Sequence, residues 1–348
     1  MDIANRVTAA LNLYRALPKV ELHRHLEGSL RLTTMLDIAR QYELTIPSSI
    51  LRLSALVQVN EEDQPTFQNF LSKFATLRLF YRSPEVIHRI TSEAIEDAAK
   101  DNVQYMELRF TPVALSRAQS FPLRDVMGWV ISSAKEASIK HKVATRLIAS
   151  VNRHESVELA EQVARLAADH IQDGLVGLDL AGNEADFPAQ PFYGVFKEAK
   201  QAGLHMTIHA GEWGPAENIR EAIEIIGAER IGHGVRILED QAVVALARER
   251  QTAFEVCVTS NYQSGIVSSR KAHPLAKMLE TGLNVTINTD DPSISRIVLS
   301  DEYRVACEEL HLSQSALNGR ILAAARAAFT REDEKEILIQ RLEKELKL

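Results

Sequence analysis

The sequence has little cysteine: Cys257 and Cys307 are the only two, and no CxxC pair occurs. This pattern excludes a disulfide framework and a metal site built on paired thiolates. The sequence also lacks an uncharged apolar run of the roughly 18 residues that a membrane span needs. Its N-terminal segment lacks the basic region followed by an apolar stretch that is typical of a signal peptide. We therefore expect a cytoplasmic protein with no membrane partner.

Positive charge is scarce as well. The chain has 40 Lys and Arg against 47 Asp and Glu, which gives a net charge of −7. It contains no basic stripe of the kind that binds nucleic acid, so we expect no nucleic-acid partner. This charge balance places no restriction on a small neutral substrate. The sequence does not indicate an oligomeric state.

Linkers, low-complexity tracts and internal repeats are also absent. The chain has 348 residues, of which 45% are hydrophobic and 25% charged, a composition typical of soluble globular proteins. Length alone allows two ordinary domains or one (β/α)8 barrel with insertions. Because there is no linker, we expect a single domain over residues 1–348.

Short apolar runs alternate with longer amphipathic stretches along the chain. This alternation predicts parallel strands with helical crossovers, and hence an α/β fold of the TIM (β/α)8 barrel type. The eight predicted strands are Val20–His23, Val103–Phe110, Ala144–Val151, Leu175–Leu180, His205–Ile208, Arg230–Gly232, Phe254–Val258 and Asn284–Asn288. Helical spacing of apolar residues predicts helices within Ser83–Lys100, Ser156–Asp173 and Ala216–Ile226.

Two regions depart from this alternation and predict extra helices. The first lies between Leu26 and the second strand, where about 75 residues are too many for one crossover. A lid over the barrel mouth is expected here, with the apolar side chains of one predicted helix on one face: Phe67, Phe70, Leu71 and Phe74. The second region follows Asp291 and ends in a charged amphipathic segment, Arg331–Leu348.

The first predicted strand ends in His23-Arg24-His25. Residues i and i+2 of a strand point to the same side, so both imidazoles are placed to face the barrel interior and bind one metal ion. In barrels of this type the C-terminal ends of the strands carry the chemistry. An HxH pair alone is weak evidence, because such pairs are more often two solvated or core histidines than metal ligands.

Two further strands end in histidine. His209 is followed by Ala210, Gly211 and Glu212, and Gly211 permits a tight turn that brings the Glu212 carboxylate over a metal-bound water. His233 stands between two glycines, which leave its ring unobstructed. His205 shares the strand parity of His209, and we interpret it as structural.

The last strand ends in Asn288-Thr289-Asp290-Asp291-Pro292. Two adjacent carboxylates after an apolar strand are costly unless they bind a cation or polar partners, although an Asx turn before Pro292 is a competing explanation. The ends of the first, fifth and eighth strands together offer three histidines and one carboxylate to a metal. This open N3O set is typical of catalytic rather than structural sites. Zn²⁺ is the first expectation, with Fe²⁺ and Mn²⁺ open.

The sequence resembles the adenosine deaminase family of the amidohydrolase superfamily in five ordered segments: LPKVELHRHLEGSL, GLDLAGNE, TIHAGE, RIGHGVR and INTDDP. These segments run from Leu17 to Pro292. The segment FLSKF, with Phe70, Leu71 and Phe74, is similar to the family's hydrophobic helix that covers the substrate.

The resemblance implies one Zn²⁺ per chain, with ligands His23, His25, His209 and Asp290. It implies hydrolytic deamination of adenosine, and of 2′-deoxyadenosine, to the inosine product and ammonia by a zinc-activated hydroxide that attacks C6 of the purine.

The resemblance also implies roles for residues that touch the substrate. Glu212 would protonate the purine N1, His233 would orient the attacking hydroxide, and Asp291 would hydrogen-bond N7. The backbone N–H of Gly182 would meet N3.

Glu27 departs from the family pattern, because many adenosine deaminases have Asp at this position, where it reaches the ribose 5′-hydroxyl. Glu is similar to adenine deaminases of the superfamily. Adenine and a modified adenosine of the aminodeoxyfutalosine type therefore stay open as substrates.

A different enzyme class also stays open, namely an amidohydrolase acting on another C–N bond. Such barrels often hold two metal ions bridged by a carboxylated lysine, but Leu180-Ala181-Gly182 stands at the end of the fourth strand. The absence of lysine there favours a single metal ion. A non-enzymatic scaffold would be expected to lack a ligand or Glu212, and none is missing.

Overall fold

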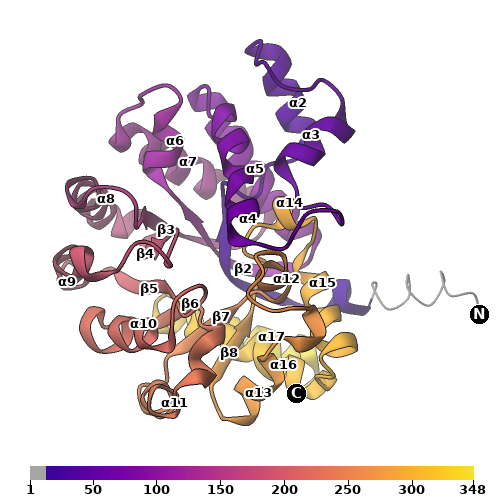
Figure 1. The fold of residues 1–348 in the computed structure, drawn as a ribbon, viewed down its shortest axis with the longest axis vertical. Helices are drawn as coiled ribbons and strands as arrows, with labels where there is room; N and C mark the ends of the chain where they lie inside the picture. Colours follow the sequence, from indigo (N-terminus) through magenta and orange to yellow (C-terminus); the bar gives the residue numbers. More distant parts are fainter. Residues whose placement is uncertain (1–12) are drawn as a thin grey trace, which may run out of the picture.

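The computed structural model describes residues 13–348, and its centre is one sheet of eight parallel strands (Figure 1). The strands are β1 (Lys19–His25), β2 (Val103–Phe110), β3 (Ala144–Asn152), β4 (Leu175–Ala181), β5 (His205–Ala210), β6 (Arg230–His233), β7 (Ala253–Val256) and β8 (Asn284–Ile287). They pair in sequence order from β1 to β8. The predicted TIM barrel is confirmed, although most strand boundaries differ from the predicted ones by one or two residues. The predicted end of the seventh strand was wrong: β7 ends at Val256, because Val258 already begins a helix.

The barrel closes between β1 and the segment that follows β8. The backbone N–H of His25 donates to the carbonyl of Asp290 at 2.9 Å, and the N–H of Asp290 donates to the carbonyl of His23 at 2.9 Å. The seam of the barrel therefore joins the first predicted metal-binding segment directly to the last.

Helices surround the strands on the outside (Figure 1). They are α2 (Leu32–Gln41), α3 (Ile50–Val57), α4 (Phe67–Leu77), α5 (Pro84–Lys100), α6 (Pro112–Arg117), α7 (Leu123–His141), α8 (Val157–Asp169), α9 (Tyr193–Gln201), α10 (Ala216–Glu221), α11 (Gln241–Glu249), α12 (Val258–Gln263), α13 (Leu275–Glu280), α14 (Pro292–Ser295), α15 (Leu299–Arg304), α16 (Gln314–Ala327) and α17 (Glu332–Leu346). None of those in the described part of the chain is long and apolar enough to cross a membrane.

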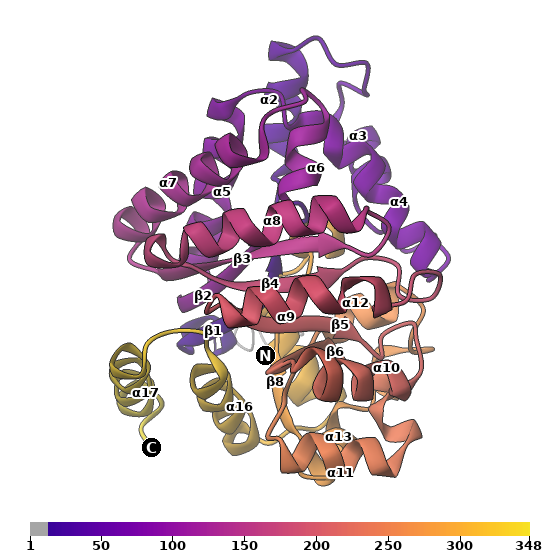
Figure 2. The same cartoon turned by 90° about the vertical axis from the view of Figure 1, so that its left-hand side faces the viewer.

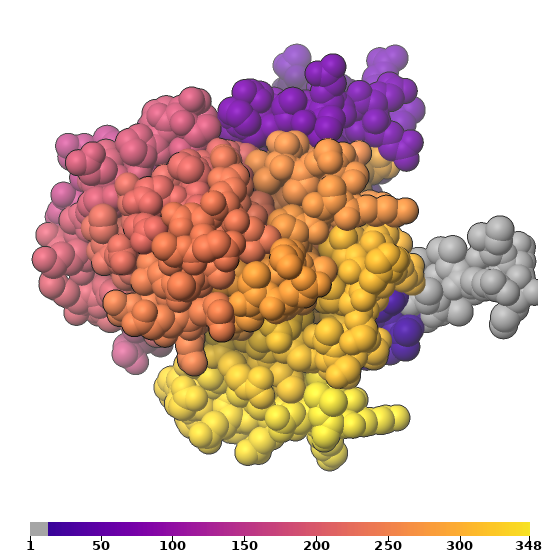
Figure 3. Space-filling view, turned by 60° about the horizontal axis from the view of Figure 1, so that its bottom comes forward, coloured from indigo at the N-terminus to yellow at the C-terminus, as the bar shows by residue number. Residues whose placement is uncertain are grey.

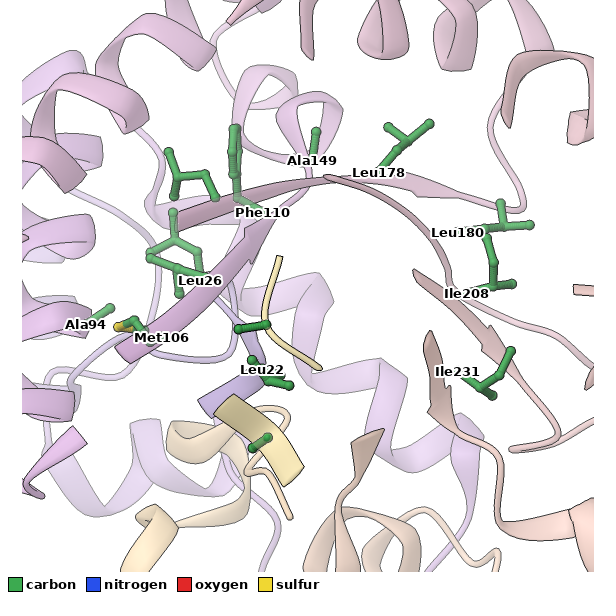
Figure 4. Packing of buried hydrophobic residues seen from close by; sticks show 14 of the residues in the cluster. Leu22, Leu26, Ala94, Met106, Phe110, Ala149, Leu178, Leu180, Ile208 and Ile231 are labelled. Carbon is green, nitrogen blue, oxygen red and sulfur yellow. The ribbon is translucent and has the colours of Figure 1, made fainter. Parts of the chain in front are cut away.

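Alternating side chains divide the buried residues of the strands into two sets. One set is apolar and packs against the surrounding helices, as Leu180, Ile208 and Ile231 do in Figure 4. The other set fills the barrel interior, and its members are polar: Glu107, Arg109, Asp179, Thr207, Arg230, Glu255 and Thr286. The apolar core thus lies between the strands and the helices, whereas the barrel axis carries charge.

The two predicted insertions are both helical. Helices α2, α3 and α4 precede the crossover helix α5 and lie at the top of Figure 2, whereas α16 and α17 lie side by side at its lower left. Helix α17 buries Leu338, Leu342 and Leu346 and belongs to the yellow surface at the bottom of Figure 3. The charged C-terminal segment thus packs on the barrel through one leucine face.

Candidate metal centre and active site

A pocket of about 270 Å³ opens at the C-terminal ends of the strands. Its lining includes eleven of the twelve residues predicted from the sequence: His25, Glu27, Phe70, Leu71, Phe74, Gly182, His209, Glu212, His233, Asp290 and Asp291. The twelfth, His23, is completely buried. Helix α4 contributes the apolar wall, so the predicted cover lies over the barrel mouth.

Five possible metal ligands meet at one end of this pocket. Ligand atoms of His23, His209, His233 and Asp290 all lie within 4.8 Å of one another. His25 forms an overlapping group with His209 and Asp179, and its Nε2 lies 3.4 Å from Oδ1 of Asp290. Distance alone therefore does not separate His25 from His233 as a ligand.

Buried carboxylates hold two of the imidazoles from behind. Nδ1 of His23 lies 2.8 Å from Oε2 of Glu255, and Nδ1 of His209 lies 2.9 Å from Oδ1 of Asp179. Each carboxylate accepts the Nδ1 proton and leaves the Nε2 lone pair free, as in carboxylate–histidine–metal arrangements. Nε2 of His23 is buried and has no hydrogen-bond partner. An orphaned nitrogen of this kind fits a bound cation.

Arg109 links the two supporting carboxylates inside the barrel. Its guanidinium lies 2.7 Å from Glu255 and 3.3 Å from Asp179. Burial raises the pKa of both carboxyls, but for Glu255 the charges of Arg109 and Arg230 outweigh burial and hold its pKa well below the usual range. For Asp179, the charges of His209 and Arg109 likewise lower the pKa. Both carboxyl groups are therefore anionic, which allows each of them to accept the Nδ1–H of its histidine.

Two site residues have backbone angles that side chains rarely adopt. The φ angle is 60° at His233 and 67° at Asp290. Such left-handed conformations cost about 1–3 kcal/mol each and persist only where the surroundings impose them. For Asp290 the surroundings include the barrel seam and Ser260, whose hydroxyl donates to Oδ2 at 2.6 Å.

A buried hydrogen-bond chain fixes the tautomer of His233. The backbone N–H of Leu275 donates to Nδ1 of His273 at 3.0 Å, so the proton of His273 is on Nε2, which lies 3.2 Å from Oδ1 of Asn261. The amide nitrogen of Asn261 therefore faces Nδ1 of His233, at 3.0 Å. Burial lowers the pKa of His273 to about 3, so this ring is neutral. His233 consequently accepts at Nδ1 and carries its proton on Nε2.

That Nε2–H points into the active site, 3.7 Å from Oε2 of Glu212 and 3.9 Å from Oδ2 of Asp290. A nitrogen that carries a proton has no lone pair for a metal. His233 is therefore placed to donate a hydrogen bond beside the metal centre, whereas His23 and His209 are placed to ligate.

The loop that carries Glu212 is folded around another carboxylate, Glu184. The N–H of Gly211 donates to Oε1 of Glu184 at 2.7 Å, and the N–H groups of Glu212, Trp213 and Gly214 donate to its Oε2, each at 3.0 Å. Gly211 has a φ of 64°, which permits this turn. Four consecutive backbone donors on one side chain fix the position of Glu212.

Burial raises the pKa of Glu212 well above its usual value, and the negative charges of Asp290 and Glu184 raise it further. Burial, followed by the charges of Asp290 and Glu27, does the same to the pKa of Asp291. Both groups therefore favour the protonated form, in which a carboxyl group donates a hydrogen bond.

Glu27 lines the same pocket and is partly held by the barrel. Its Oε1 accepts from the N–H of Thr111 at 2.5 Å, while its Oε2 is buried and has no hydrogen-bond partner. Gly28, the next residue, is required by close packing, because a Cβ there would lie 1.8 Å from Oδ1 of Asp291.

Sequence reasoning missed the supporting residues of this site. They are Asp179, Glu255 and Arg109 behind the histidines, Asn261 and His273 behind His233, and Glu184 under the Glu212 loop. Charged residues at alternate positions of apolar strands were an available signal for the first three. His205, by contrast, is half-exposed, pairs with Glu229 at 3.0 Å and lies outside the pocket.

Comparison with known proteins identifies relatives over almost the whole chain. The family model for adenosine deaminase matches residues 18–345. The adenosine deaminase of Klebsiella pneumoniae (strain 342) is 38% identical over 331 residues, which cover 94% of this chain and 98% of that protein.

Two solved structures share the fold. The adenine deaminase of Arthrobacter aurescens has a TM-score of 0.88 at 27% identity, covering 95% of this chain and 100% of that one. An amidohydrolase from Burkholderia ambifaria with bound Zn has a TM-score of 0.89 at 26% identity, covering 97% of this chain and 92% of that one.

Proposed function

The chain belongs to the adenosine deaminase family, and from this premise we propose that it hydrolyses adenosine and 2′-deoxyadenosine to the inosine product and ammonia. One observation carries the proposal: a cluster of histidines and Asp290 lies beside a buried carboxyl, Glu212, whose pKa is raised, in a single pocket. Deamination needs such a pair, because water must be activated and a ring nitrogen must receive a proton.

We propose that His23, His25, His209 and Asp290 hold one Zn²⁺. The carboxylate support behind His23 and His209 and the protonated Nε2 of His233 favour this assignment over one that includes His233. When bound by these residues, the ion would lower the pKa of a water molecule and so provide a nucleophile near neutral pH. No lysine lines the pocket formed by the described residues, which favours one metal ion over a lysine-bridged pair.

The remaining side chains are proposed to act on the purine. Glu212 holds a proton that it gives to N1, so that the ring accepts electrons without a full negative charge. Asp291, protonated, donates to N7. Gly182, with a φ of 92°, presents its backbone N–H to N3, and the Nε2–H of His233 orients the attacking oxygen. The apolar face of Phe70 and Phe74 excludes water from the ring.

The pocket lining also includes Arg78 and His154, which have no role toward the purine in this proposal. These additional walls favour a nucleoside over the free base, because the sugar occupies space that adenine alone would leave empty.

The test is a substrate panel with the purified protein. Loss of purine absorbance and release of ammonia are measured for adenosine, 2′-deoxyadenosine and adenine, before and after metal removal by a chelator. We expect both nucleosides to react with kcat/KM far above that of adenine, activity to vanish with the metal, and one equivalent of zinc to restore it. Adenine reacting faster than adenosine, or full activity without metal, would overturn the proposal.

A further inference from the structure

One cationic side chain of the pocket has no part in the proposed reaction. Arg78 is the sole Arg or Lys among the described residues that line the pocket. It follows directly on α4 and opens the 3₁₀ turn η1 (Arg78–Phe80). Phe70, Phe74 and Arg78 are spaced four residues apart, so they lie on the same face of the helix. The guanidinium therefore continues the face that covers the purine.

Helix α4 places Arg78 away from the reacting end of the pocket. At its N-terminal end, the ring of Phe67 lies 5.3 Å from that of Trp213, the residue after Glu212. Eight residues separate Phe70 from Arg78, which is a rise of about 12 Å at 1.5 Å per residue. Arg78 thus lies two turns farther along the helix, where Glu27 and His154 form the other walls of the pocket.

The charge of Arg78 is not neutralised by the protein. Within residues 13–348, no carboxylate oxygen lies within 4.0 Å of its guanidinium and no hydrogen bond from its side chain is formed. Its Nε is buried without a partner. Arg117, by contrast, has an anionic partner, since its guanidinium lies 2.8 Å from a carboxylate oxygen of Glu155. A pocket-lining arginine without a partner leaves a forked set of donors for a ligand.

Glu27 is the nearest candidate partner within the pocket, and it does not fill this role. One of its oxygens is committed to the N–H of Thr111. Its other oxygen is buried and makes no hydrogen bond, so Glu27 does not pair with the guanidinium of Arg78. His154 has a different partner, since its Nε2 lies 3.2 Å from Oε1 of Glu155.

We infer that the pocket prefers a purine nucleoside with an anionic group, a carboxylate or a phosphate, attached at the 5′ side of the sugar, and that Arg78 binds this group. The inference rests on the proposed function, which places the six-membered ring at Glu212. The sugar is attached at N9, across the purine from the amino group, and its exocyclic 5′ carbon is the position from which a substituent extends farthest. Such a substituent is directed toward the end of the pocket that Arg78 lines.

The experiment compares matched substrates. Initial rates give kcat/KM for adenosine, adenosine 5′-carboxylate, its neutral 5′-carboxamide and adenosine 5′-phosphate. The proteins are the wild type, Arg78→Gln, Arg78→Lys and a control, Arg82→Gln. Arg82 is matched because its Nε is also buried without a partner, but it does not line the pocket.

We expect wild type to favour the carboxylate over the carboxamide by about tenfold or more, since a hydrogen bond to a charged group contributes this much. That ratio should fall to near one in Arg78→Gln, recover in part in Arg78→Lys and stay unchanged in Arg82→Gln. Comparison with the phosphate identifies which anion is preferred.

A ratio near one in the wild type, or a ratio that survives Arg78→Gln, would overturn the inference while leaving adenosine deamination intact. If neither adenosine nor any derivative reacts, the proposed function fails instead, so the two failures are distinguishable.

Discussion

The side-chain amide of Asn261 lies 3.0 Å from Nδ1 of His233, and this contact decides which ring nitrogen of His233 carries the proton. The amide donates, so the Nε2–H of His233 is directed at the space between Glu212 and Asp290. The orientation of the amide is set in turn by His273, whose tautomer is fixed by a backbone N–H. A buried residue with no contact to the substrate thus determines the role of an active-site histidine.

Replacing the amide by a carboxylate tests this relationship. In Asn261→Asp the carboxylate accepts a proton from Nδ1 of His233 and reverses the tautomer, so we expect kcat to fall by roughly 10²–10⁴. Asn261→Ala removes the contact without imposing the wrong tautomer, and its loss should be clearly smaller. Steady-state kinetics at equal metal content make the comparison. Equal activity of the two variants would show that the tautomer does not matter.

Glu184 is predicted to act as a positioning residue for Glu212. In the wild type, both carboxylate oxygens of Glu184 accept from backbone N–H groups. In Glu184→Gln an amide N–H₂ replaces one of these oxygens and leaves its donors unsatisfied, and each unsatisfied donor costs about 1–3 kcal/mol. We expect kcat to fall by about tenfold to a hundredfold, with KM and metal content near wild type. Glu184→Asp keeps the charge and should restore part of the loss. A change confined to thermal stability would mean that Glu184 serves the fold and not the position of Glu212.

The carboxylate behind His209 should control metal affinity. Asp179→Asn removes the anion that holds the ring in its ligating tautomer, and we expect metal affinity to fall by about 10–100-fold. Competition with a chromophoric chelator measures it without reference to activity. The matched control is Glu229→Gln, because Glu229 also pairs with a histidine, His205 at 3.0 Å, outside the pocket. If both variants bind metal equally well, Asp179 has no supporting role.

Glu302 should make stability depend on pH. Its carboxyl accepts hydrogen bonds from Thr259, and burial raises its pKa from 4.5 to about 7. Because the folded state then binds the proton more tightly than the unfolded state, this group lowers the free energy of unfolding as pH rises from about 4.5 to 7, by about 3 kcal/mol in all.

The variant Glu302→Gln cannot ionise, so it should not lose this stability. Its free energy of unfolding minus that of the wild type should therefore be larger at pH 8 than at pH 5. Urea unfolding at both values measures the difference. A difference between the two proteins that is the same at pH 5 and pH 8 would contradict a raised pKa.

The sequence was sufficient for the parts of the fold that follow from local patterns. Strand–helix alternation gives the barrel, and strand parity places His23 and His25 on one side of β1. The extra length after the first strand gives the cover formed by α4. These features depend on the order, spacing and length of neighbouring segments, so they can be recognised in a single sequence.

The supporting contacts could not be predicted in the same way. Glu255 meets His23 across 232 positions of sequence, and Asn261 and His273 reach His233 from α12 and the segment after it. Their roles depend on how neighbouring strands and helices pack. The positive φ angles of His233 and Asp290 could not be predicted either, because Asp and His adopt that region more often than most residues but still do so only in a minority of cases.

The most direct test of the account is the kcat of Glu212→Gln with adenosine, measured at full metal occupancy. Glutamine keeps the size and the neutral charge of the protonated carboxyl but cannot give its proton to N1. We predict that kcat falls by at least about a hundredfold while metal content and the affinity for inosine stay near wild type. Activity within about tenfold of wild type would contradict the assignment of Glu212 as the proton donor.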